Sequence, residues 1–316
     1  MTAFGAAWRD RRWGRAARYV LTFDRIGVEM IAVTGATGQL GRLVVKNLLE
    51  RGVEPARIVA LVRSPEKAQD LAARGIQVRR ADYAEPETLG TALEGVERLL
   101  LISSNEVGAR VEQHRNVVKA AQEAGVKLLA YTSSPKADTS TMQLAGDHRA
   151  TEESIRASGI PFVFLRNSWY LENYTGNLSS ALEHGALLGS AGQGRVSAAT
   201  RADFAAAAAA VLTGSRHENR VYELGGDQAF TMAELAGIIA EESGRPVEYR
   251  DLPEEAYVDA LVGFGVREGF ARALAESDGA LARGELFTDS GDLSRLIGRP
   301  TTSPRDAVAF ALNAGS

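Results

Sequence analysis

A glycine-rich turn near the start of the patterned part of the chain has the residue types that bind phosphate. It reads Gly35-Ala36-Thr37-Gly38-Gln39-Leu40-Gly41, follows a β-branched run and opens a helical pattern. Glycine there permits the tight bend, the close approach of a pyrophosphate and the packing of helix against strand. Backbone N–H groups at the helix start, with the helix dipole, hold the phosphates. The strand before and the helix after distinguish this turn from chance glycines, so we expect a dinucleotide to contact Gly35, Ala36, Thr37, Gly38, Gln39 and Leu40.

The end of the second strand-like run indicates which dinucleotide binds. The spacing G-x-x-G-x-x-G is typical of short-chain dehydrogenase relatives, and an NAD enzyme usually offers an acidic residue to the ribose at this strand end. This chain has Arg63 instead, in Leu61-Val62-Arg63-Ser64-Pro65. A guanidinium binds a 2′-phosphate bidentately, whereas a carboxylate would repel it; the alternative is an ordinary exposed arginine. We predict NADPH as the cofactor.

Asp82 follows the third strand-like run, at the place where the adenine ring lies in such folds. Its carboxylate either accepts a hydrogen bond from the adenine amino group or caps the helix that begins after Pro86. We include it among the predicted cofactor contacts.

The region expected to hold a proton donor lacks the usual pair. Short-chain dehydrogenases use Tyr-x-x-x-Lys, in which lysine lowers the tyrosine pKa, but the helical stretch Gly146–Glu153 contains neither residue. Reduction of an unactivated carbonyl is therefore not predicted. A quinone is electron-poor, and hydride transfer to it gives a delocalised anion that water can protonate, so positioning supplies much of the catalysis.

A polar and aromatic segment follows the sixth strand-like run. It combines the aromatic residues Trp169, Tyr170 and Tyr174 with amides, which suits stacking of a flat aromatic substrate at the carboxyl edge of a sheet. The alternative is that these rings pack a smaller lobe. Asn173 is the predicted catalytic residue, because an amide can donate to a carbonyl oxygen without changing its protonation state.

The elements that position these residues alternate regularly from Met30 onward. Stripes of apolar residues at helical spacing separate short strand-like runs, which predicts right-handed βαβ units and a Rossmann-type, doubly wound parallel sheet. The runs are Ile31–Thr34, Ile58–Val62, Ile76–Arg79, Arg98–Ile102, Lys127–Tyr131 and Phe162–Leu165.

Three parts of the chain are expected. Residues 1–29, rich in arginine, are predicted to be a disordered extension, residues 30–166 the NADP-binding domain, and residues 167–316 mainly a smaller α/β substrate lobe whose late elements pack back on the first domain. Within the lobe, the alanine-rich stretch Ala202–Thr213 predicts a helix. Val221–Leu224 predicts a strand, and Thr231 with Glu234 forms a capping box.

Composition excludes several classes of partner. The 316 residues carry a formal net charge of −4, which gives no attraction to nucleic acid or anionic membranes. No cysteine is present, and the four histidines form no i, i+4 pair, so thiolate chemistry and a metal site are not predicted. No apolar run reaches the 18 residues of a membrane span. We expect a cytoplasmic protein, with a homodimer as one assembly open to it.

The chain resembles the NmrA-like family, and within it bacterial NAD(P)H:quinone oxidoreductases of the second type, with triphenylmethane reductases as near relatives. The residues that carry the resemblance are Met30–Arg63, Leu99–Gly108, Arg166–Tyr174 and Ala199–Asp203. One departure is Glu153, where a lysine is expected.

The resemblance implies a flavin-free NADPH-dependent quinone reductase. By it, the nicotinamide and the substrate are surrounded by Asn105, Asn167, Ser168, Trp169, Tyr170, Leu171, Glu172 and Asn173. The alternatives are a non-catalytic NADP-sensing regulator and a reductase of triphenylmethane dyes or other conjugated acceptors.

Overall fold

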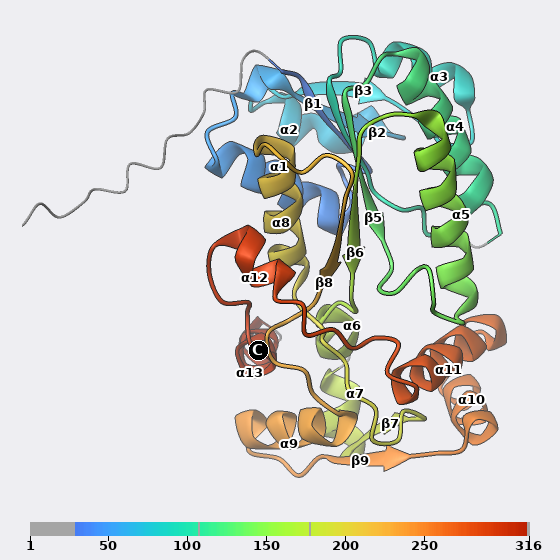
Figure 1. Cartoon of the computed structure of the whole chain (residues 1–316). Helices are drawn as coiled ribbons and strands as arrows, with labels where there is room; N and C mark the ends of the chain where they lie inside the picture. Colours follow the sequence, from blue (N-terminus) through green and yellow to red (C-terminus); the bar gives the residue numbers. More distant parts are fainter. Residues whose placement is uncertain (1–28, 107, 177, 315–316) are drawn as a thin grey trace, which may run out of the picture.

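Seven parallel strands form the central sheet, in the order β3-β2-β1-β4-β5-β6-β8 (Figure 1). The computed structural model describes residues 29–106, 108–176 and 178–314. The order reverses between β1 and β4, and such a reversal opens a crevice at the carboxyl ends of the strands. The predicted doubly wound sheet is confirmed. Its strands are β1 (Ile31–Thr34), β2 (Ile58–Val62), β3 (Gln77–Arg80), β4 (Arg98–Leu101), β5 (Leu128–Ser133), β6 (Phe162–Asn167) and β8 (Arg220–Leu224).

Helices cover both faces of this sheet (Figure 1). One face packs against α1 (Gln39–Glu50), α2 (Gln69–Ala72), α8 (Arg201–Thr213) and α12 (Asp292–Ile297), and the other against α3 (Pro86–Ala92), α4 (Arg110–Glu123) and α5 (Gln143–Ser158). Alanine is a strong helix former, and the small side chains of α8 let it lie closely along α1. Short 3₁₀ helices, η1 (Pro55–Arg57) and η2 (Pro65–Ala68), flank β2.

The remaining elements build a smaller lobe with its own core, beyond the carboxyl ends of the strands (Figure 1). Its two strands, β7 and β9, pair in parallel. The elements are α6 (Glu172–Thr175), α7 (Leu178–His184), β7 (Ala186–Gly189), α9 (Met232–Ser243), β9 (Glu248–Asp251), α10 (Glu254–Gly263), α11 (Glu268–Ala282) and α13 (Pro304–Ala314).

Local sequence signals hold in the lobe as well. The capping box of Thr231 and Glu234 at the start of α9 is confirmed, since each side chain bonds the other's backbone N–H. The helix ends at Gly244 in the left-handed conformation, with φ of 66°, which costs glycine little.

Strands β5 and β6 each run two residues past their predicted carboxyl ends. β5 continues through Thr132 and Ser133, and β6 continues to Asn167, because these residues go on pairing with their neighbours. The prediction ended both strands at the last apolar residue. Backbone pairing does not depend on side-chain polarity, so the polar ends of both strands reach the carboxyl edge of the sheet.

The predicted disordered extension lies outside the described residues except for its last member. Glu29 Oε2 accepts from Arg98 Nε at 2.5 Å, and both side chains are partly buried. Within the described ranges, every helix is too short or too polar to cross a membrane.

Candidate active site

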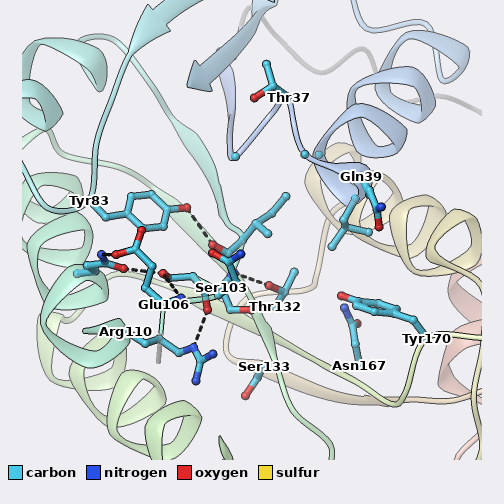
Figure 2. Close-up of a pocket in the computed structure, with 18 of the residues that line it drawn as sticks. Thr37, Gln39, Tyr83, Ser103, Glu106, Arg110, Thr132, Ser133, Asn167 and Tyr170 are labelled. Carbon is cyan, nitrogen blue, oxygen red and sulfur yellow. Dashed lines mark hydrogen bonds between the residues drawn. The ribbon is translucent and has the colours of Figure 1, made fainter. Parts of the chain in front are cut away.

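A cavity of about 1120 Å³ lies at the carboxyl edge of the sheet, where the sheet faces the smaller lobe. In Figure 2 Thr37 and Gln39 of the glycine turn stand on one side of it, and Asn167 and Tyr170 on another. Thirteen of the predicted site residues line this cavity: Gly35, Thr37, Gly38, Gln39, Leu40, Arg63, Asp82, Asn105, Asn167, Ser168, Trp169, Tyr170 and Asn173.

The glycine turn has the tight geometry that its sequence predicts. Gly35 has φ of 56°, and the N–H of Gly38 donates to the Gly35 oxygen at 2.9 Å. A Cβ on Gly41 would lie 2.3 Å from the same oxygen, so only glycine fits where α1 begins. Ala36 is fully buried behind the turn and lies outside the cavity lining; a side-chain contact between it and a cofactor stays a prediction.

Arg63 stands at the carboxyl end of β2, with its guanidinium largely exposed. It forms an ion pair with Glu106, the two groups lying 3.1 Å apart. Two more cations, Arg42 and Lys67, line the same end of the cavity. Sequence reasoning missed both, although Lys67 follows Arg63 by only four residues. This end of the cavity therefore suits an anionic group.

Asp82 closes a turn, with Oδ1 accepting from the Ala84 N–H at 2.9 Å. The N-cap of α3 is Glu85, so the alternative that Asp82 caps this helix is wrong. The next residue, Tyr83, hydrogen-bonds Thr34 and the Ile102 oxygen and so joins the ends of three strands (Figure 2).

Two buried polar atoms of the cavity wall have no partner within the described chain. They are Oγ of Ser134 and Oδ1 of Asn167. Buried polar atoms are nearly always hydrogen-bonded. Both therefore call for a polar ligand, and Asn167 reaches its place because β6 runs two residues further than predicted.

The aromatic residues after β6 divide between the two predicted roles. Trp169 and Tyr170 line the cavity, and Tyr170 also packs edge-on against Phe204. Tyr174 packs against Phe230 in the core of the lobe, so its position does not support stacking on a substrate.

Leu171 and Glu172 lie outside the cavity lining. Leu171 is fully buried in the core of the lobe, and Glu172 accepts from the Arg201 N–H at 2.9 Å. Their predicted contact with the cofactor stays untested.

Asn173 is exposed at the cavity, and a cation fixes the orientation of its amide. Its Oδ1 accepts from Arg201 Nη2 at 3.1 Å, and the same guanidinium lies 4.4 Å above the Tyr170 ring. Because the oxygen is engaged, the Nδ2 donor is left without a partner among the described residues. This arrangement can present a neutral hydrogen-bond donor to a ligand.

Sequence reasoning missed the wall formed by β5, α4 and α5, where Thr132, Ser133, Arg110 and His148 line the cavity. His148 and Glu152 on α5 have the same i, i+4 spacing as the Tyr-x-x-x-Lys pair that is absent from this helix. That spacing was the available signal.

The Glu152 carboxylate belongs to a buried network on this wall. It accepts from Ser133 Oγ at 2.7 Å and from the Arg166 guanidinium at 2.8 and 2.9 Å. Burial opposes the charge of Arg166, but hydrogen bonds with Glu152 and Glu223 raise its pKa. A paired carboxylate therefore stands four residues after His148, at the spacing that lysine has in the Tyr-x-x-x-Lys pair.

Comparisons with known proteins cover nearly the whole patterned chain. The model of the NmrA-like family matches residues 28–285. Quinone oxidoreductase 2 of Escherichia coli is 51% identical over 284 residues, which are 90% of this chain and 99% of that protein. The crystal structure of the NADPH-dependent quinone oxidoreductase of E. coli with NADPH superposes with a TM-score of 0.88, over 90% of this chain and 100% of that one. Triphenylmethane reductase from Citrobacter sp. is 44% identical, with a TM-score of 0.86 over 90% and 99% of the two chains.

Proposed function

The chain belongs to the NmrA-like family, as its sequence predicted, and from that premise we propose that it is an NADPH-dependent quinone reductase. One observation carries the proposal: the likeness to the E. coli quinone oxidoreductase spans both lobes, and thus both the dinucleotide turn and the segment around Asn173.

The residues of the cavity fit NADPH. The turn at Gly35–Gly41 offers backbone N–H groups to the pyrophosphate, and Arg63 offers a cation to the 2′-phosphate. The carboxamide of a nicotinamide has both donors and an acceptor, which suits the unpartnered atoms of Ser134 and Asn167. When bound, NADPH supplies the hydride, and the protein supplies orientation and electrostatics without a flavin.

The lobe side of the cavity fits a flat acceptor with a carbonyl oxygen. Trp169 and Tyr170 give it aromatic surface, and the free Nδ2 of Asn173 donates to the oxygen on which negative charge grows. Such preorganised donors stabilise the transition state of an addition to a carbonyl system.

A second candidate is the reduction of triphenylmethane dyes, favoured by the 44% identity to the Citrobacter enzyme. A dye of this class is a conjugated acceptor without the quinone oxygens. Asn173 would then have no oxygen to bind, so Asn173→Ala would slow quinone reduction but leave dye reduction unchanged.

The test is steady-state oxidation of NADPH by the full chain with simple benzoquinones, naphthoquinones and a triphenylmethane dye. We expect quinone-dependent turnover that exceeds the rate with dye and needs no added flavin. Tight NADPH binding with no turnover on any acceptor would contradict the proposal and favour the NADP-sensing regulator.

A further inference from the structure

A buried chain of hydrogen bonds leads from the loop after β4 to the cavity. It joins His114 on α4, Tyr131 on β5 and His148 on α5, which are 0%, 0% and 5% exposed. Only His148 of the three lines the cavity. The proposed function makes no use of these residues.

The first hydrogen bond determines which ring nitrogen of His114 carries the proton. The backbone N–H of Ser104 donates to His114 Nε2 at 2.9 Å, so this nitrogen is an acceptor. A neutral imidazole carries one proton, which must then sit on Nδ1. Nδ1 faces Thr151 Oγ1 at 2.9 Å. The Thr151 hydroxyl donates its own proton to the backbone carbonyl oxygen of Asp147. Thr151 therefore accepts from His114.

The second hydrogen bond determines which ring nitrogen of His148 carries the proton. The Tyr131 hydroxyl lies 3.5 Å from the protonated Nδ1 of His114 and 2.7 Å from Nδ1 of His148. A buried hydroxyl needs an acceptor. The Thr151 hydroxyl also lies near Tyr131, but it already accepts from His114 and donates to Asp147, so we assign the Tyr131 proton to the short contact with His148 Nδ1. Nδ1 of His148 is thus unprotonated, and its proton sits on Nε2.

Nε2 of His148 is open to the cavity. It makes no hydrogen bond within the described chain, and it is not among the fully buried polar atoms that lack a partner. The chain therefore ends in an N–H donor on the cavity wall to which α5 contributes.

The surroundings keep this imidazole neutral. Burial lowers the pKa of His148 to about 3, helped by the positive charge of Arg110 on α4 and by His114. Asp147 holds Arg110 at 2.8 Å, and Glu152 is paired with Arg166, so neither carboxylate is free to charge the ring.

We propose that His148 is a catalytic residue whose Nε2–H donates to a carbonyl oxygen of the quinone, while Tyr131 and His114 are positioning residues that hold this tautomer. The inference rests on the proposed function. The quinone takes up a hydride with its two electrons from the nicotinamide and then one proton from water, and His148 keeps its proton throughout. A neutral imidazole N–H is an established stabiliser of developing oxyanions, and a quinone has two oxygens, so His148 and Asn173 can each serve one.

The tautomer can be measured without substrate. The chain has four histidines, so ¹⁵N-histidine labelling gives a spectrum in which His148 is assigned by its absence from the His148→Gln variant. At neutral pH we expect His148 to be neutral and protonated on Nε2. Tyr131→Phe should convert it to a mixture of tautomers. A wild-type His148 protonated on Nδ1, or charged, would overturn the inference.

Kinetics test the catalytic role. Removing one preorganised oxyanion donor typically costs about 10²–10³ in kcat, so His148→Leu should lower kcat by that factor and change the Kd of NADPH less than twofold. His148→Gln retains an amide donor and should recover at least about tenfold of the loss. His184→Gln, at an exposed histidine bonded to the Ser180 oxygen, is the control and should match wild type.

A double-mutant cycle separates positioning from structural support. Tyr131→Phe should lower kcat in the wild-type background but change it little in the His148→Gln background, where no tautomer exists to hold. An equal loss in both backgrounds would overturn the positioning role.

The two proposals fail in different ways. A wild type that oxidises no NADPH with any quinone overturns the proposed function, and the catalytic role with it. An active wild type whose His148→Leu variant turns over normally overturns the role of His148 alone.

Discussion

The two walls of the cavity are positioned by different means. The nucleotide wall (residues 35–42 with the ends of β2 and β3) is made of strand–turn–helix units in which neighbours in sequence are neighbours in space. The lobe wall (residues 167–174) is held by distant segments: Ser168 Oγ donates to the Leu286 oxygen, 118 residues away, and Leu171 N–H donates to the Ala199 oxygen. Local pattern determines the first wall, and tertiary packing determines the second.

The largest expected effect is on the lobe wall. Asn173→Asp keeps the shape but replaces a donor with a charge that repels the developing oxyanion. Turnover should fall by two to three orders of magnitude, corresponding to about 3–4 kcal/mol in the barrier, with little change in NADPH affinity. Stopped-flow reduction of a benzoquinone and fluorescence titration with NADPH measure the two quantities. An aspartate variant as fast as wild type would mean that the aromatic surfaces alone position the substrate.

Gly41→Ala tests the nucleotide wall. The new Cβ would lie 2.3 Å from the Gly35 oxygen and 2.8 Å from the Ala36 Cα, and backbone cannot move aside cheaply. We expect the free energy of unfolding to drop by about 3 kcal/mol, the upper range for overpacking, with weaker NADPH binding. Gly90→Ala, in α3 with open space around its Cβ position, is the control and should be neutral or stabilising. Equal behaviour of the two variants in urea unfolding would refute the steric argument.

Arg63→Ala should change cofactor preference. Loss of a charge-assisted contact should weaken NADPH binding by about 1.5–3 kcal/mol and leave NADH nearly unchanged. Arg80→Ala is the matched control, because Arg80 is also an exposed arginine at a strand end and pairs with Glu85. Equal losses for both cofactors would show that Arg63 does not recognise the 2′-phosphate.

Buried groups on α4 and α5 and a buried carboxyl in the smaller lobe should change the free energy of unfolding in opposite directions as the pH falls. Burial lowers the pKa values of His114 and His148 to about 3, so between pH 6.5 and 3 the unfolded chain binds more protons, and stability falls as pH falls. The slope approaches about 1.4 kcal/mol per pH unit for each histidine.

In the smaller lobe, burial raises the pKa of Asp278 to about 6. Between pH 6 and 3.8 the folded chain binds the extra proton, so this group adds stability as pH falls. In urea unfolding between pH 7 and 5, the free energy of unfolding of His148→Gln should fall less than that of the wild type as the pH falls. That of Asp278→Asn should fall more. The reverse pattern would contradict both assignments.

The smallest effect concerns the start of the chain. A chain beginning at Met30 should keep its turnover and lose at most about 1 kcal/mol of stability relative to one beginning at Glu29, because a single ion pair with Arg98 is removed. Thermal unfolding of both, beside the full chain, measures this. A clear fall in turnover on removing residues 1–28 would mean that they contact the body.

The difference between the walls explains what the sequence could predict. The strand–turn–helix signal located the glycine turn and Arg63 without any tertiary information. Asn173 and Tyr170 were predicted from the mixture of aromatic residues and amides after the sixth strand-like run, together with a family resemblance. His148 and Arg110 escaped notice because their approach to the cavity depends on how α4 and α5 pack. The sequence left two roles open for Tyr174, because nothing local indicates Phe230 as its neighbour, and the structure supports packing in the lobe.

The position of α8 and α12 in the sequence has a consequence for the growing polypeptide. The three helices α3, α4 and α5 that cover one face of the sheet are all made by residue 158, whereas the other face receives α1 and α2 early but α8 and α12 only with residues 201–213 and 292–297. Domains fold as units from the N-terminus during synthesis. We expect the part of this face that α8 covers, including β4, to stay uncovered until residues 201–213 have been made. Helix α1, which follows the dinucleotide turn and is made early, therefore gains its main helical packing partner, α8, only after residue 213 has been made.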